Sequence, residues 1–461
     1  MKVLLVIYDN VSYISWFPQG LAYIAAALRD KHDIVIYNQD MHHYPNEHLT
    51  EYLNKNHFDV LGVSVTGGYY QYRKLLKISE AVNKSKNRPF YVIGGHGPSP
   101  DPTYFIKKTG ADAIVIGEGE LTVTELLNCL ENKTLLSNVA GIAYKDGDSV
   151  IINEKRKLIK DIDSIKFPAY DLFPIEYYRL IREPNTVNTN FVIPILSGRG
   201  CPFTCNFCYR LDKGFRPRSN DSIIEEINLL KTNHGINYID FNDDLLMSSP
   251  KRIISICEDI IKHNLNIKWS CNGRLNYVTK EIIDIMKRAG CVFINYGIES
   301  VDDGALKRMN KHLTVEQIIS GVEATLDGGI SPGLNIIFGN IGETKEILKK
   351  DVEFLLKYDD FAQMRTIRPV TPYPGSPLYY YAIEKGLLKD CEDFYENKHT
   401  NSDLMSVNFT NMSDDEFYKE LYNANKILLN NYNKNKTRQT EDTLYNLYIK
   451  RDANFRGFRT T

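Results

Sequence analysis

Residues 197–208 read Ser-Gly-Arg-Gly-Cys-Pro-Phe-Thr-Cys-Asn-Phe-Cys, and this stretch spaces Cys201, Cys205 and Cys208 as C-x3-C-x2-C. It follows a short apolar run at 193–196 that is typical of a strand. Three cysteine thiolates at this spacing can hold a four-iron four-sulfur cluster and leave its fourth iron open. The stretch therefore predicts a strand that ends in a cluster-binding loop.

Zinc is the alternative metal, but a structural zinc site needs a fourth ligand. The nearest histidines, His234 and His263, are neither close in sequence nor paired with a second cysteine cluster. The other cysteines are scattered and are typical of small buried residues. The triad thus favours an iron–sulfur cluster.

Around the triad, a strand–helix series runs from about 190 to 380. Its six expected strands lie near 193–196, 238–241, 268–270, 292–296, 334–338 and 366–369. Six such units predict a partial (β/α)6 TIM-type barrel, whose active site lies at the C-terminal ends of the strands. We assign residues 186–385 to this core and 386–461 to a mainly helical C-terminal cap.

With Phe207 directly before the last cysteine, this segment resembles the radical S-adenosylmethionine (SAM) superfamily. The resemblance implies that SAM chelates the open iron and is cleaved to a 5′-deoxyadenosyl radical. It places Phe207 beside SAM. It also implies that an external electron donor of the flavodoxin or ferredoxin type supplies the electron.

The resemblance also implies SAM contacts at the ends of the barrel strands. Asp243 and Asp244 would receive the amino group, and Arg274 would pair with the carboxylate. Glu299 would accept from the ribose hydroxyls, and Gly339 would let the backbone approach the adenine. Singly, each residue is equally typical of a helix cap or a solvated side chain. Their common register at strand ends favours a cofactor site.

Residues 1 to about 140 alternate short apolar runs, at 3–7, 34–37, 60–65, 91–93 and 113–116, with helical patterns. This alternation predicts an α/β fold with a Rossmann-like parallel sheet. Residues 141–185 are interpreted as a hairpin with an Asp-Gly turn, followed by an interdomain linker rich in proline and aromatic residues.

A Rossmann-like domain before such a barrel resembles cobalamin-binding radical SAM proteins. Ligands bind at the C-terminal edge of an open parallel sheet, where small and hydroxyl residues leave room for the cobalamin nucleotide. The resemblance implies these contacts: Gly20, Ser64, Thr66, Gly94, Gly95, Glu118 and Gly119. No Asp-x-His-x-x-Gly motif follows the first strand, so no histidine axial ligand is expected. Two alternatives stay open: Gly94-Gly95 as a plain phosphate-contacting turn, and a domain kept without cobalamin.

Composition restricts the partners. The chain has 461 residues and a net charge of −2, which provides no general attraction to nucleic acid. No run approaches the roughly 20 apolar residues of a membrane span, and the N-terminus lacks a signal peptide, so we expect a cytoplasmic protein.

With both cofactors, the expected reaction is methylation of an unactivated carbon in a small-molecule or peptide substrate, through the adenosyl radical and methylcobalamin. The alternative is an oxidoreductase, cyclase or rearrangement enzyme without methyl transfer. Transfer RNA methylthiolation is disfavoured by the neutral charge and the single cysteine cluster. A non-enzymatic cobalamin carrier would leave the triad without a use.

Overall fold

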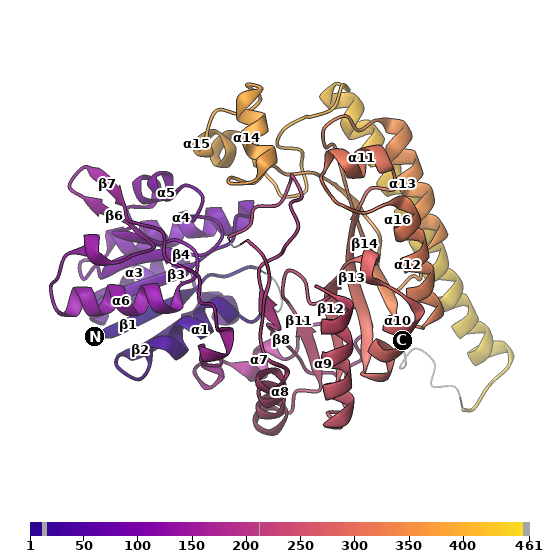
Figure 1. Cartoon of the computed structure of the whole chain (residues 1–461), viewed down its shortest axis with the longest axis horizontal. Helices are drawn as coiled ribbons and strands as arrows, with labels where there is room; N and C mark the ends of the chain where they lie inside the picture. Colours follow the sequence, from indigo (N-terminus) through magenta and orange to yellow (C-terminus); the bar gives the residue numbers. More distant parts are fainter. Residues whose placement is uncertain (12–15, 212, 455–461) are drawn as a thin grey trace.

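The computed structural model describes residues 1–11, 16–211 and 213–454, and it divides into two sheets with their helices (Figure 1). The first sheet has the strand order β2-β1-β3-β4-β5-β6-β7, and its first five strands are parallel. These five are β1 (Lys2–Ile7), β2 (Asp33–Asn38), β3 (Val60–Ser64), β4 (Phe90–Gly94) and β5 (Ala113–Val115). The predicted Rossmann-like sheet is confirmed.

Helices cover both faces of this sheet, which is why its strands are continuous apolar runs. One face packs on α1 (Gln19–Leu28) and α6 (Glu120–Glu131), and the other on α3 (Asn46–Lys55), α4 (Tyr69–Lys84) and α5 (Pro102–Thr109). The short α2 (Gln39–His42) follows β2, and η1 (Leu136–Asn138) follows α6.

The hairpin β6 (Ile142–Asp146) and β7 (Ser149–Ile152) extends the first sheet. It pairs antiparallel with β5. We had placed it with the linker, and the structure corrects this. The physical reason is that β5 would otherwise be an edge strand with unpaired backbone groups.

The connector that follows is packed between the two halves. It contains η2 (Ile162–Ser164), η3 (Tyr170–Leu172) and α7 (Ile175–Tyr178). The Ala169 amide donates to the carbonyl of Ala22 in α1 (3.0 Å), and the Tyr170 hydroxyl donates to Glu226 in α8 (2.7 Å). The connector therefore ties the first sheet to the barrel.

The second sheet has six parallel strands in the order β15-β14-β13-β12-β11-β8 and confirms the predicted partial barrel. Its strands are β8 (Val192–Ile195), β11 (Tyr238–Phe241), β12 (Lys268–Gly273), β13 (Cys291–Glu299), β14 (Ser331–Phe338) and β15 (Ile367–Pro369). The surrounding helices are α8 (Asn220–His234), α9 (Pro250–Lys262), α10 (Lys280–Arg288), α11 (Asp303–Arg308), α12 (Val315–Asp327) and α13 (Lys345–Lys357), with η4 (Leu275–Tyr277) after β12. A two-stranded ribbon of β9 (Gly198–Arg199) and β10 (Arg216–Pro217) flanks the cysteine loop.

The C-terminal region is mainly helical, as expected, and it contacts both halves. A long helix, α16 (Asp414–Leu444), lies along the outer face of the barrel against α13 and β15 and ends in η6 (Tyr445–Ile449) (Figure 1). The preceding α14 (Pro377–Glu384), α15 (Cys391–Asp393) and η5 (Phe394–Lys398) share a core with the first sheet. There Tyr395 stacks on Tyr72 of α4 at 4.5 Å, and Glu396 pairs with Lys108 of α5 at 2.8 Å.

No helix among the residues that the structure describes is both long enough and apolar enough to cross a membrane.

Candidate functional site

The cysteine loop leaves β8 at the C-terminal edge of the barrel and is fixed by one asparagine. The side-chain amide of Asn206 donates to Asn340 (3.1 Å), and that of Asn340 donates back (3.0 Å). The Asn206 amide nitrogen donates to Met309 (2.9 Å), and its carbonyl accepts from Leu378 (2.8 Å). A single residue between two cysteines thus binds the loop to three separate segments. The sequence reasoning missed Asn206, although a polar residue inside the triad was the available signal.

The three cysteine thiols differ in exposure: Cys205 is buried, Cys201 is half-buried and Cys208 is exposed. Within the described ranges, no group of three His, Cys, Asp or Glu side chains that could hold a single metal ion is found. Burial raises the pKa of the half-buried Cys201 thiol, and desolvation by surrounding protein atoms, with the neighbouring Cys205, raises the pKa of Cys208, whose side chain nevertheless reaches solvent. Thiols that hold their protons in the free chain ionise when a metal binds, which couples cluster loading to proton release.

Arg274 braces the cysteine loop from behind. Its guanidinium carbon lies 3.5 Å from the centre of the Phe203 ring, and its Nη2 donates to the carbonyls of Lys311 and His312. Burial lowers the pKa of Arg274, and its interaction with the neighbouring Cys205 side chain opposes this shift. The structure thus brings Arg274 to the triad, and its contact with a SAM carboxylate stays a prediction.

The two predicted aspartates differ in their surroundings. Asp243 is 2% exposed and accepts from the Ser197 amide (2.7 Å) and the Ser197 hydroxyl. Burial raises the pKa of Asp243 to about 7. Its carboxyl group therefore fixes the turn that precedes the triad. Asp244 is exposed, and its charge contributes to the raised pKa of Cys201. Of the two, Asp244 is the one with an open carboxylate near the loop.

Glu299 forms a buried ion pair that the sequence analysis did not find. Its Oε1 accepts from Lys311 Nζ at 2.8 Å, and both side chains are at most 10% exposed. The Lys311 ammonium lies 5.7 Å from the centre of the Phe207 ring, next to the last cysteine. Glu299 has a left-handed backbone with φ of +72°, a strained conformation of the kind that clusters at functional sites.

Gly339 faces a helix. A Cβ added there would lie 2.7 Å from the Phe417 ring of α16, and φ is +97°. Its amide and that of Asn340 donate to Glu343 (2.7 and 2.8 Å), which closes the loop after β14. The tight approach at Gly339 is therefore with α16, and contact with adenine stays a prediction.

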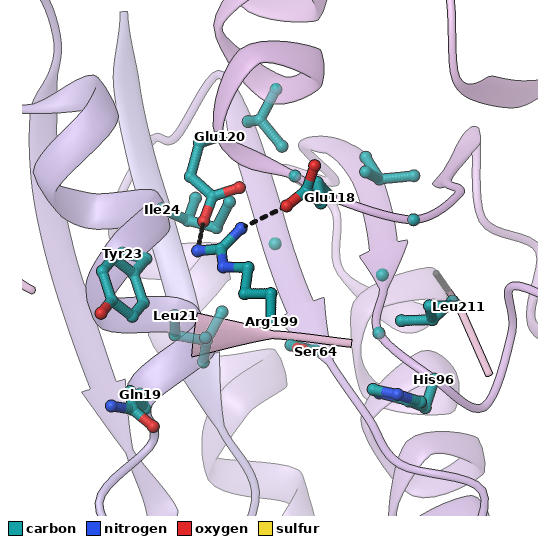
Figure 2. Close-up of a pocket in the computed structure, with 18 of the residues that line it drawn as sticks. Gln19, Leu21, Tyr23, Ile24, Ser64, His96, Glu118, Glu120, Arg199 and Leu211 are labelled. Carbon is teal, nitrogen blue, oxygen red and sulfur yellow. Dashed lines mark hydrogen bonds and ion pairs between the residues drawn. The ribbon is translucent and has the colours of Figure 1, made fainter. Parts of the chain in front are cut away.

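A cavity of about 350 Å³ opens between the first sheet and the ribbon beside the cysteine loop (Figure 2). Residues of α1 and the buried Val3 of β1 both line it, so it is a slot between this helix and the sheet. Six of the seven predicted cobalamin residues line it: Gly20, Ser64, Gly94, Gly95, Glu118 and Gly119. At Gly95, a Cβ would lie 2.4 Å from the Val65 carbonyl oxygen, so only glycine fits. A slot with mostly apolar walls and close backbone approach suits the nucleotide tail of cobalamin.

Glu118 uses its carboxylate in an ion-pair network across the two halves. Arg199 of β9 donates to Glu118 (2.8 Å) and to Glu120, as Figure 2 shows, and Arg216 of β10 also pairs with Glu118 (3.0 Å). The Ile159 amide donates to its other oxygen (2.9 Å). Burial alone would lower the pKa of Arg199, but Glu120 and Glu118 raise it. The predicted cobalamin residue is therefore part of a network that joins the sheet to the cysteine loop.

A second cavity, of about 630 Å³, lies between the first sheet, the cysteine loop, β15 and the C-terminal region. Thr66, the seventh predicted cobalamin residue, lines this cavity, as do Phe207 and Cys208. His96 lines both cavities, and Figure 2 labels it, with Leu211, among the side chains of the first. The two cavities are therefore neighbours, with His96 in the lining of both.

This arrangement defines a class of protein in which a barrel with a three-cysteine loop faces a ligand-binding parallel sheet. Family models match both halves of the chain. Residues 195–355 match the radical SAM superfamily, and residues 6–127 match the B12 binding domain. An uncharacterized methyltransferase of Pyrococcus horikoshii is 32% identical over 84% of each chain. The chain belongs to the radical SAM superfamily and carries a B12 binding domain. Its cofactors are a [4Fe–4S] cluster, SAM and cobalamin.

More distant relatives share this architecture. The anaerobic magnesium-protoporphyrin IX monomethyl ester cyclase of Rubrivivax gelatinosus is 26% identical over 82% of this chain and 69% of its own. The radical SAM methyltransferase TsrM of Kitasatospora setae, solved with cobalamin and a [4Fe–4S] cluster, superposes with a TM-score of 0.74 at 17% identity, over 93% of this chain and 88% of its own. The cobalamin-dependent enzyme OxsB superposes with a TM-score of 0.65 at 22% identity, over 83% of this chain and 55% of its own. These structures share the fold.

Proposed function

We propose that this enzyme methylates an unactivated carbon of a small-molecule or peptide substrate. The carrying observation is that the cobalamin-type cavity and the cavity at Cys208 are adjacent and share His96 as a lining residue. A substrate in the second cavity would lie between the two cofactor sites. Relatives named as methyltransferases support this reading, among them the Pyrococcus horikoshii protein and the bacteriochlorophyllide d C-12(1)-methyltransferase of Chlorobaculum tepidum, which is 28% identical over 50% of this chain.

The roles of the site residues belong to the same proposal. Cys201, Cys205 and Cys208 would hold the cluster, and exposed Asp244 would receive the SAM amino group. The residues of the first cavity would hold cobalamin, with residues 1–140 as the cobalamin part and 186–385 as the radical core. When bound, the three cofactors supply one electron, a hydrogen-abstracting radical and a transferable methyl group.

The chain's own groups position these partners and exclude water. The Asn206–Asn340 amide pair fixes the cysteine loop, and the Glu299–Lys311 pair places a paired, desolvated charge beside Phe207. A paired charge can orient a polar ligand without attracting bulk water into the radical site.

The proposal also includes the source of the electron and the compartment in which the enzyme works. An acidic one-electron carrier of the flavodoxin or ferredoxin type would reduce the cluster. All eight cysteines are free thiols, as in proteins of the reducing cytoplasm, where we place this enzyme.

One anaerobic experiment tests methylation. The protein is reconstituted with iron, sulfide and hydroxocobalamin, and then given methyl-labelled SAM, reduced flavodoxin and candidate substrates. A methylase releases both S-adenosylhomocysteine and 5′-deoxyadenosine and transfers the label to the substrate. The matched control is Cys205→Ala, which should lose the cluster absorbance and both products.

A cyclase or oxidoreductase without methyl transfer is the second candidate, because several relatives are named as monomethyl ester cyclases. Substrate turnover with 5′-deoxyadenosine as the only SAM product would establish this candidate and reject methylation.

A further inference from the structure

The second cavity has one strongly charged residue in its described lining. Arg368 of β15 lines it, and the other lining residues include no lysine, aspartate or glutamate. At about 630 Å³ the cavity falls within the size range of small-molecule sites. A single cation in an otherwise uncharged cavity favours a ligand with one anionic group.

The barrel register directs Arg368 toward this cavity. Arg368 pairs with Ile337 of β14, and both residues line the cavity. The preceding residue, Ile367, is buried and does not line the cavity, as expected when side chains alternate along a strand, whereas Pro369 at the end of β15 lines it together with Arg368. The edge strand itself is held by α16: Asn425 accepts from the Ile367 amide (2.8 Å) and donates to the Ile367 carbonyl (3.0 Å). The backbone next to Arg368 is therefore held in place by hydrogen bonds from α16.

The guanidinium has donors left for a ligand. Among the described residues its ion pair is with Asp403, where Nε lies 3.2 Å from a carboxylate oxygen. Both side chains are more than 60% exposed, so this pair contributes little and is easily exchanged. As far as the described residues go, both terminal nitrogens of the guanidinium remain for a bidentate contact with a carboxylate or phosphate.

Aromatic rings form the walls near the cysteine loop. Phe207 and Tyr209 of the cysteine loop line the cavity together with Cys208 and Tyr373. Tyr395 also lines it but is 1% exposed and stacks on Tyr72, so its ring is already packed in the core. Tyr373 is held by ring contacts with Phe394 (5.9 Å) and with the fully buried His399 (5.4 Å). Such fixed faces provide apolar contact area and stacking for a flat ring system.

We propose that the substrate is a small ring-bearing acid and that Arg368 binds its carboxylate or phosphate group. This rests on the proposed function, since it takes the second cavity as the substrate site. The ring of the substrate then lies between the aromatic walls, on the side of the cavity nearest to Cys208. Arg368 is a binding residue that selects substrates by charge.

Matched acid and neutral probes test the proposal by isothermal titration calorimetry. The protein is reconstituted with cluster and hydroxocobalamin and left without reductant, so binding is measured without turnover. Tryptophan is compared with tryptophanamide for the carboxylate arm, and cytidine 5′-monophosphate with cytidine for the phosphate arm. We expect the acid of at least one pair to bind about tenfold more tightly, as one exposed charge-assisted contact provides.

In Arg368→Gln this preference should fall to about one, and in Arg368→Lys it should be intermediate, because lysine keeps the charge without the bidentate geometry. Arg438→Gln, which changes an exposed arginine on α16, is the matched control and should keep the wild-type preference. Unchanged cluster absorbance shows that each variant is folded. Equal binding within both pairs in the wild type, or a preference that survives Arg368→Gln, would overturn the proposal. Methyl transfer is measured separately, so either proposal can fail alone.

Discussion

The ion pair between Arg199 and Glu120 gives the most direct test of how the two halves are joined. Arg199 lies on the ribbon beside the cysteine loop, Glu120 begins α6, and their side chains are 14% and 9% exposed. In Arg199→Met, Glu118 keeps Arg216 as a partner. Glu120 loses its ion pair, and its other oxygen already lacks a hydrogen-bond partner within the described ranges. A buried carboxylate is then left uncompensated.

The magnitude follows from burial. Breaking a buried pair from one side costs about 3–5 kcal/mol. The position of Glu120 in the first turn of α6 offsets about 1 kcal/mol, because the helix dipole favours a negative charge there. We therefore expect Arg199→Met to lower the free energy of unfolding by about 3 kcal/mol. Adding Glu120→Gln removes the orphaned charge and should restore about 2 kcal/mol.

Urea unfolding of the four chains of this double-mutant cycle, followed by circular dichroism, measures these free energies. The control is Arg29→Met, which removes an exposed pair with Asp171 (2.6 Å) and should cost less than about 1 kcal/mol. If Arg199→Met costs no more than this control, or if the double variant is no more stable than the single one, the pair does not join the two halves as argued.

Three further predictions concern single positions. Burial and a nearby aspartate raise the pKa of Glu183 to about 8, so the folded chain holds a proton that the unfolded chain releases near 4.5. The stabilising contribution of the protonated Glu183 is therefore full below pH 4.5 and is lost as the pH rises from there through about 8. The melting temperature should fall over this pH range, and Glu183→Gln should make the fall less steep. An unchanged dependence of melting temperature on pH in this variant would contradict the prediction. Gly95→Ala should lower stability in thermal melts by about 1–3 kcal/mol, because φ is +103° there, whereas Gly94→Ala meets only ordinary contacts and should cost less; equal losses would refute the argument. Asn206→Ala and Asn340→Ala should each speed the loss of cluster absorbance, and the double variant should be no worse than either single one.

Much of the fold could be predicted because it depends on local patterns. Alternating strand and helix periods predicted both sheets, and the strands lie within a few residues of their expected positions. The hairpin was found, but its pairing with β5 was not, since strand partners are chosen across the chain. The helical character of the C-terminal cap was likewise predicted, but its contacts through Tyr395 and Glu396 with the first sheet were not, because they depend on long-range packing.

The sequence by itself determined which cofactor the barrel binds. Three cysteines at a fixed spacing predict an iron–sulfur cluster, because these ligands lie within one loop and need no partner from a distant segment. Only the tertiary structure decided how the other predicted residues are used. Glu118 forms ion pairs with Arg199 and Arg216, which are 81 and 98 positions away in the sequence. Arg274 hydrogen-bonds to backbone carbonyls next to the cysteine loop, and Arg368 lines a cavity formed by four segments. Such roles depend on which side chains fold together, and no local pattern encodes that.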